Sequence, residues 1–284
     1  MRSLTTVAAE TVVPLYVDVT DPCFFDHPLD HLPGMLLVSG LLDLVRAQAQ
    51  RHEATAEDSR SRLRISMTFD RIAEPGQEVL LHCRPVCTDD GPAWQATAEQ
   101  DGNAVASALI AFGGAARSAG HPDQDGSGCA PWGSADDRTV PAEAALVHRQ
   151  SEQNILLGAP RRSELASVLV PPAGHRLSGD ADGPRTPEAL IESARQLTTL
   201  LGHTAHGREL DAQMLWLALD ADLPTDLPTT LPLALRWDFT PSRGSRAGYF
   251  MVLIEPESGR EHGRIEILVH TISKDRYRAR RAKV

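Results

Sequence analysis

The sequence contains no run of roughly 18 apolar residues, the length that a membrane-spanning helix needs. Residues 1–7 lack the apolar core of a secretory signal peptide, so we expect a cytoplasmic protein without a membrane partner. Basic residues are in the minority, with 28 lysines and arginines against 38 acids. The resulting net charge of −10 argues against a nucleic-acid partner.

Cysteine is also scarce, with four residues in the chain. Cys83 and Cys87 fall on a predicted strand, and no second pair of cysteines or histidines follows at zinc-site spacing. We therefore predict reduced thiols, no metal and no cofactor. Cys23 has no base placed beside it by spacing, so we interpret it as a small buried residue and not as a nucleophile.

The first half of the chain has one strongly apolar helical segment, 34–52, whose apolar residues cover nearly every side. Such a helix is buried inside a protein. An entering strand precedes it at 10–20, and the alternating pattern of half-buried strands follows it. The turn Asp101-Gly102 predicts a hairpin. The strands predicted after the helix cover 63–69, 79–83, 94–99 and 105–112.

The second half repeats this order. Strand regions are predicted at 144–148 and 154–157, followed by a helix with Thr186 as N-cap and Pro187 at its first position. The remaining strands are predicted at 213–219 and 231–239, with a long hairpin between 249–255 and 264–270.

The halves also share a detail, because an Asp stands six residues before a Gly in both, at 70–76 and 238–244. We predict an internal repeat. The expected fold is α+β, a tandem (double) hotdog in which two antiparallel sheets each wrap a long central helix. The expected parts are an N-terminal repeat (1–113), a flexible linker (114–139), a C-terminal repeat (140–273) and a basic tail (274–284). The tail is either solvated and disordered or a docking strip for an acidic partner.

Residues 26–35 are rich in titratable side chains. Two acids and two histidines stand within six positions and are followed by Pro-Gly and the buried helix. The sequence there is Asp-His-Pro-Leu-Asp-His-Leu-Pro-Gly-Met. Asp26 and Asp30 favour the helix dipole and can orient the imidazoles of His27 and His31. These groups either close the helix N-terminus or line a site.

This string resembles the signature of the A-factor synthase (AfsA-like) hotdog family of butyrolactone biosynthesis. Residues 147–149 with 155–157, and the helix at 188–196, are similar to two further segments of that family. The motifs stand in swapped order between the two repeats. The helix after the first motif also carries Ser39 where the family has glutamate.

The resemblance implies a site across the seam between the repeats, pairing His27 or His31 with Glu192. Backbone amides near Gly34 and Met35 could polarise a thioester oxygen. A second site would pair His175 with Ser39, which cannot act as an acid or base at neutral pH. We therefore expect one working site, with the catalytic candidates His27, His31, Glu192 and Arg195 and the substrate-binding candidates Asp26, Asp30, Gly34, Met35, Thr199, His148 and His175.

Glu192, Arg195 and Thr199 are spaced to share a helix face, and Arg195 should keep the Glu192 carboxylate ionised by lowering its pKa. The alternative is an ordinary surface ion pair. His148 and Arg149 are either contacts for a phosphate or carrier protein, or ordinary surface groups.

Three functions remain open. The first is transfer of a β-ketoacyl group from an acyl carrier protein or coenzyme A thioester to a dihydroxyacetone-phosphate-like hydroxyl, in secondary metabolism. The second is a dehydratase or isomerase of β-hydroxyacyl thioesters, since the same His and Glu would serve. The third is a non-catalytic acyl or lactone binder. A homo-oligomer is compatible with all three.

Overall fold

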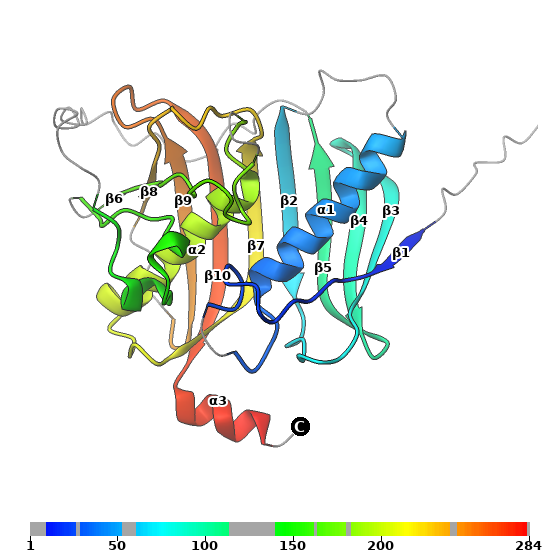
Figure 1. Cartoon of the computed structure of the whole chain (residues 1–284), viewed down its shortest axis with the longest axis horizontal. Helices are drawn as coiled ribbons and strands as arrows, with labels where there is room; N and C mark the ends of the chain where they lie inside the picture. The colour runs from blue at the N-terminus through cyan, green and yellow to red at the C-terminus, as the bar shows by residue number, and fades with distance from the viewer. Residues whose placement is uncertain are drawn as a thin grey trace, which may run out of the picture.

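The structure is a computed structural model that describes residues 10–26, 29–52, 61–113, 140–161, 164–179, 183–238 and 243–282. The predicted linker 114–139 and the candidate His27 lie outside these ranges. None of the helices in the described ranges is long and apolar enough to cross a membrane. The elements (Figure 1; η is a 3-10 helix) are β1 Thr11–Pro14, α1 Gly34–His52, β2 Arg62–Phe69, β3 Leu80–Thr88, β4 Gly91–Gln100, β5 Asn103–Phe112, η2 Ala144–Val147, η3 Glu152–Asn154, β6 Leu165–Ser167, α2 Pro187–Thr204, β7 Gln213–Pro224, β8 Ala234–Trp237, β9 Arg246–Ile254, β10 Glu261–Ile272 and α3 Lys274–Arg281.

The described strands form one antiparallel sheet in the order β1-β3-β4-β5-β2-β7-β10-β9-β8-β6. The prediction of two separate sheets is therefore wrong. β2 and β7 pair from Arg62↔Pro224 to Thr68↔Ala218 and join the two halves. In either half alone, β2 or β7 would be an edge strand with unpaired N–H and C=O groups. The pairing of β2 with β7 satisfies the backbone groups of both strands.

A buried ion pair closes this joint between the halves. Arg62 Nε donates to Asp222 Oδ1 at 2.8 Å, and its Nη1 donates to the carbonyl of His262 at 3.2 Å. The Asp222 side chain is 4% exposed. The pair therefore satisfies polar groups that the sheet junction removes from water.

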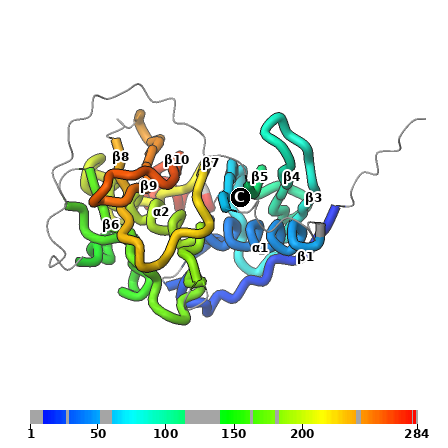
Figure 2. Tube along the Cα trace, turned by 90° about the horizontal axis from the view of Figure 1, so that it is seen from above, coloured from blue at the N-terminus to red at the C-terminus, as the bar shows by residue number. Residues whose placement is uncertain are grey.

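The two long helices lie on the same face of the sheet, α1 over the first half and α2 over the second (Figure 1). Seen from above, each half of the sheet curves around its own helix (Figure 2). The predicted burial of α1 is confirmed for its first half, where Leu37, Val38 and Leu41 are at most 2% exposed. Further along the helix Asp43, Ala47 and Gln50 are exposed, so burial on all sides is not confirmed there. An ion pair in which Arg46 Nη2 lies 2.9 Å from Glu188 Oε2 connects the two helices.

The start of α2 is as predicted. Thr186 Oγ1 accepts a hydrogen bond from the amide of Ala189 at 3.2 Å, and Pro187 occupies the first turn. This cap satisfies one of the amides that a helix N-terminus leaves unpaired. Because α2 is buried along nearly its whole length, its polar residues need partners inside the protein.

Two predicted strand regions of the second half are wrong. Residues 144–148 and 154–157 contain the 3-10 helices η2 and η3 and only an isolated bridge at Leu157. For 154–157 the reason is a side chain that replaces a strand partner: Gln196 accepts from the amide of Leu156 at 2.9 Å and donates to the carbonyl of Asn154 at 2.7 Å. The first predicted strand, 10–20, is also shorter than expected. It ends at Pro14, which has no N–H to donate.

The described part of the basic tail forms α3, so the interpretation of this segment as disordered is wrong. Tyr277 is 4% exposed, and Arg281 pairs with Glu74 of the first half. The buried Tyr277 ring and ion pairs that include Arg281–Glu74 and Lys274–Asp211 attach this highly charged helix to the rest of the protein.

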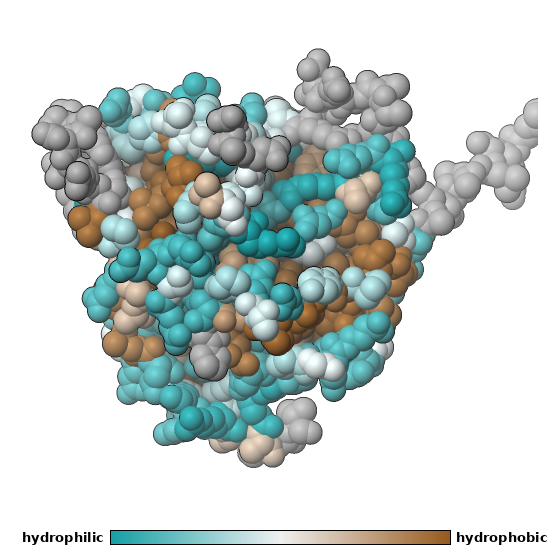
Figure 3. Space-filling model, viewed as in Figure 1, coloured by the Kyte–Doolittle hydropathy of each residue, from teal (hydrophilic) through white to brown (hydrophobic). Residues whose placement is uncertain are grey.

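The face that carries the helices is mainly hydrophilic, but hydrophobic side chains gather on its α1 half (Figure 3). Val12 of β1 and Val19 just after it are 46% and 58% exposed. β1 is the end strand of the sheet. The possible homo-oligomer stays a prediction.

Candidate active site

A cavity of about 1070 Å³ is lined by both halves of the chain. The first half contributes the loop before α1 and the end of β2, and the second contributes α2, β7, β10 and α3. Its walls are mixed, with aromatic rings, imidazoles and several arginines. Seven of the predicted site residues line it: Asp30, His31, Gly34, Met35, His148, Arg195 and Thr199.

Asp30 and His31 form a dyad at this cavity. His31 Nδ1 lies 2.9 Å from Asp30 Oδ1. Burial acts to raise the pKa of Asp30, but hydrogen bonds from His31 and from the hydroxyl of Tyr277 outweigh it and lower that pKa. An ionised carboxylate only accepts, so Nδ1 of His31 is the donor. The neutral ring then carries its lone pair on Nε2.

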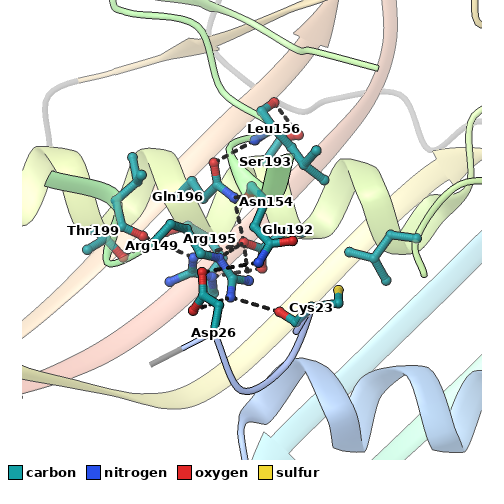
Figure 4. Close-up of polar contacts among 12 residues, drawn as sticks. Cys23, Asp26, Arg149, Asn154, Leu156, Glu192, Ser193, Arg195, Gln196 and Thr199 are labelled. Atoms are coloured by element: carbon teal, nitrogen blue, oxygen red, sulfur yellow. Dashed lines mark hydrogen bonds and ion pairs between the residues drawn. The ribbon is translucent and has the colours of Figure 1, made fainter. Parts of the chain in front are cut away.

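Glu192 lies fully buried on α2, in a cluster of hydrogen bonds (Figure 4). Arg149 Nη2 donates to its Oε1 at 2.7 Å, and Arg195 Nε donates to its Oε2 at 2.8 Å. Gln196 Nε2 donates to Oε1 at 2.6 Å. Burial alone would raise the pKa of Glu192, but Arg149 and Arg195 lower it to about 2. The predicted effect of Arg195 on this carboxylate is confirmed.

Asp26 extends this cluster to the first half of the chain. Its Oδ1 lies 3.3 Å from Arg149 Nη1, and its Oδ2 accepts from the amide of Gln150 and from Asn154 Nδ2, both at 3.1 Å. Arg149 also donates to the carbonyl of Cys23 at 2.9 Å (Figure 4). We call Asp26, Arg149, Glu192, Arg195 and Gln196 the Glu192 cluster. Among the described residues that line the cavity, it contributes Arg149 and Arg195 but neither carboxylate.

His175 is held in one tautomer away from the cavity walls. Its Nδ1 accepts from the amide of Leu177 at 3.1 Å, so its Nε2 carries the proton and donates to Asn154 Oδ1 at 3.0 Å. Burial and the nearby Arg149 lower the pKa of His175 and keep the ring neutral. Its proposed partner, Ser39, has a buried hydroxyl without a hydrogen-bond partner among the described residues.

His148 reaches the cavity and is backed by a second imidazole. His203 Nδ1 lies 2.9 Å from the carbonyl of Arg208, which only accepts, so this nitrogen donates. In the neutral pair His203 Nε2 is then the acceptor, and it lies 2.9 Å from His148 Nε2. This direction gives His148 a proton on Nε2 and the lone pair on Nδ1.

Gly34 begins α1 at a point where the cavity wall is tightly packed. A Cβ at this position would lie 3.3 Å from Cε3 of Trp216 and 3.4 Å from Cε1 of Phe69. The two rings meet edge to face with centroids 5.3 Å apart. The absent side chain therefore brings the first turn of α1 up against the cavity, and the amides of Gly34 and Met35 in this turn have no hydrogen-bond partner among the described residues.

Sequence reasoning missed two features of the site. Tyr277 was hidden in the basic tail, although it is the single aromatic residue of a charged helix, a pattern that signals a buried contact. Arg149 is interpreted from the sequence as a phosphate or carrier-protein contact or as a surface group, whereas it stands at the centre of the buried Glu192 cluster. Its three anchors come from positions up to 126 residues away, and no local pattern reveals them.

Comparison with known proteins finds a family match for the second half of the chain. Residues 133–269 match the A-factor biosynthesis hotdog domain. This half of the chain is similar to that family. Over 107 residues the chain is 36% identical to the 2-oxo-3-(phosphooxy)propyl 3-oxoalkanoate synthase of Streptomyces virginiae. The match covers 36% of this chain and 33% of that protein, so the chain spans about a third of the length of this A-factor-type relative.

Solved structures support a hotdog fold over nearly the whole chain. The dehydratase domain from the CurK module of the curacin polyketide synthase matches with 13% identity, 96% coverage of both chains and a TM-score of 0.54. An acyl-CoA thioesterase II from Mycobacterium marinum matches with 17% identity, covering 84% of this chain and 89% of its own, at a TM-score of 0.50. A hotdog-fold protein from Alicyclobacillus acidocaldarius covers 94% of both chains at 12% identity and a TM-score of 0.50.

Proposed function

We propose that the chain is a tandem hotdog enzyme that transfers a β-ketoacyl group from a carrier-protein or coenzyme A thioester to the hydroxyl of a dihydroxyacetone-phosphate-like acceptor. The observation that carries this proposal is the Asp30–His31 dyad at a cavity lined by both halves of the chain. The A-factor biosynthesis domain at residues 133–269 supports the acyl-transfer chemistry.

In this mechanism His31 is the general base. Asp30 holds Nδ1 as a donor, so Nε2 can take the proton of the acceptor hydroxyl as its oxygen attacks the thioester carbonyl. The C–O bond of the new ester forms, the C–S bond breaks, and the imidazolium returns its proton to the leaving thiolate. The net products are an ester and a free thiol.

The charge that develops on the carbonyl oxygen needs donors. The first turn of α1 offers the amides of Gly34 and Met35, two residues that line the cavity and whose amides have no partner among the described residues. The helix N-terminus also stabilises negative charge. Arg195 and Thr199, which line the cavity from α2, are proposed to position the substrate, with His148 as a further polar contact.

Glu192 takes a different role from the catalytic one predicted for it with His27 or His31. Its two oxygens already accept hydrogen bonds from Arg149, Arg195 and Gln196, and its pKa of about 2 leaves little basicity. We assign it as the buried anion that fixes Arg149 and Arg195 in place. Asp26 and His175, which bond to Arg149 and Asn154, belong to the same supporting framework.

The direct test is an incubation with a β-ketoacyl thioester and dihydroxyacetone phosphate. We expect release of free thiol and a new phosphate-bearing ester in the mass spectrum, both dependent on the acceptor. A β-hydroxyacyl thioester offered alone should remain intact. Loss of water from that substrate without ester formation in the first incubation would refute the transferase.

One observation favours the dehydratase as the second candidate: two imidazoles, His31 and His148, line the same cavity. Dehydration needs one group to remove the α-proton and another to protonate the leaving hydroxyl. In that case the loss of water should depend on both histidines. A non-catalytic binder would instead bind the thioester with equal affinity before and after His31→Gln and turn over nothing.

A further inference from the structure

The last helix of the chain reaches back to the dyad from the other half of the sequence. Tyr277 of α3 is 4% exposed, and its hydroxyl donates to Asp30 Oδ1 at 2.8 Å. The hydroxyl oxygen of Tyr277 also lies 3.2 Å from His31 Nδ1. The two rings meet edge to face with centroids 6.2 Å apart, so Tyr277 contacts both members of the dyad.

The direction of these hydrogen bonds follows from the charges. Asp30 is ionised and accepts from His31 and from Tyr277 at the same Oδ1. Burial and the neighbouring Asp30 carboxylate raise the pKa of Tyr277, so its phenol keeps its proton and remains a donor. The Tyr277 hydroxyl therefore holds the carboxylate in the orientation that His31 needs.

Asp30 requires such support because its side chain is 56% exposed. A single hydrogen bond between two partly exposed groups gives little net stabilisation in water. Arg281, one turn further along α3, adds a second attachment: its Nη2 donates to the carbonyl of Asp30 at 2.8 Å, and it pairs with Glu74. Charged groups facing the dyad are thus Glu74 and Arg281, besides Asp30 itself.

We propose that Tyr277 is a positioning residue of the active site, which fixes Asp30 and through it the tautomer and direction of the His31 ring. Arg281 anchors α3 so that the tyrosine stays in place. The inference rests on the proposed function of His31 as general base. It assigns to the C-terminal helix a part in catalysis, although Tyr277 itself accepts no proton from substrate.

The first test is Tyr277→Phe, which keeps the buried ring and removes the hydroxyl. We expect roughly a tenfold loss of kcat with KM nearly unchanged, the scale of one hydrogen bond to a carboxylate. The acidic limb of the kcat profile should also move to higher pH, because the Asp30 charge is no longer partly shared with the phenol. The matched control is Arg276→Gln on the exposed side of α3, which should leave kcat and profile unchanged.

The second test is a double-mutant cycle. If Tyr277 acts through Asp30, Tyr277→Phe should lower kcat much less in an Asp30→Asn background than in the native protein. Full additivity of the two losses would overturn the proposal. Arg281→Gln offers an independent variant with the same expected coupling to Asp30, should the phenylalanine variant fold poorly.

A third measurement separates this inference from the proposed function. In protein labelled with 15N-histidine, the His31 signals should report a proton on Nδ1, and Tyr277→Phe should shift them toward a tautomer mixture. This readout needs no substrate. An inactive wild-type protein with the expected shift would refute the transferase alone, whereas an active one with unchanged His31 signals would refute the role of Tyr277 alone.

Discussion

Arg149 Nη2 lies 2.7 Å from Glu192 Oε1, with the arginine side chain 7% exposed and the carboxylate 1% exposed. The same guanidinium reaches Asp26 and the carbonyl of Cys23 in the first half of the chain. One buried cation thereby ties the loop before α1 to helix α2. This contact fixes the relative position of the elements that supply His31 and Arg195 to the cavity.

Removing one partner of this pair should destabilise the fold strongly. We expect Glu192→Gln to lower the free energy of unfolding by about 3–5 kcal/mol, because Arg149 and Arg195 then lose their buried counter-ion. Urea unfolding measures this change. The control is Glu261→Gln, which breaks the exposed Arg236–Glu261 pair and should cost under about 1 kcal/mol. Equal costs for the two variants would contradict the assignment of Glu192.

The Glu192 carboxylate should also make the stability of the fold depend on pH. The pKa of Glu192 is about 2 when folded and 4.5 ordinarily, so between these values the unfolded chain binds more protons. Its contribution, about 3 kcal/mol, is present above pH 4.5 and is lost as the pH falls toward 2. Between pH 4.5 and 2 the free energy of unfolding should fall more steeply with decreasing pH for the native protein than for Glu192→Gln. Parallel curves would show that another group dominates.

The dyad should control turnover. His31→Gln should lower kcat by about 10²–10⁴-fold, the usual contribution of a general base. Asp30→Asn should lower it less, because the ring remains but loses its fixed orientation. Steady-state assays of thiol release give both values. His262→Gln, a histidine outside the described cavity wall, serves as the control and should retain native activity.

Gly34→Ala should damage the site through packing. The new methyl group would lie 3.3 Å from Trp216, so the indole or the start of α1 must shift. We expect a loss of about 1 kcal/mol in stability and a lower kcat, because the amides of the first turn move with the helix. In Gly248→Ala the nearest atom, on Leu268, is 3.9 Å away, so that variant should be tolerated. Normal kcat in Gly34→Ala would argue against these amides as oxyanion donors.

The thiols should differ sharply in reactivity. Burial raises the pKa of Cys23 to about 12 and that of Cys83 to about 11, so neither forms a thiolate near pH 8. Among the cysteines that the structure describes, Cys87 is the exposed one. Iodoacetamide should therefore label Cys87 in the folded protein and Cys23 only after unfolding, as peptide mass spectrometry would show. Rapid labelling of Cys23 in the folded protein would contradict its interpretation as a buried, unreactive thiol.

Local signals in the sequence predicted much of the fold. The apolar pattern of 34–52, the Thr186-Pro187 start of α2 and the Asp101-Gly102 turn each act over a few residues, and the structure has the helix, the cap and the hairpin as expected. Predictions failed where a distant side chain supplies a backbone partner. Residues 154–157 have apolar character typical of a strand, yet Gln196 satisfies their backbone groups instead.

The sequence by itself determined that a dense set of acids and histidines precedes a buried helix, because residue type and spacing are local properties. It also predicted an ionised Glu192 beside Arg195, three positions along a helix. Only the tertiary structure decided that Glu192 faces Arg149 inside the protein while His31 faces the cavity with Asp30 and Tyr277. Burial and charge neutralisation are sums over residues far apart in the chain, so they emerge only once the two halves are packed together.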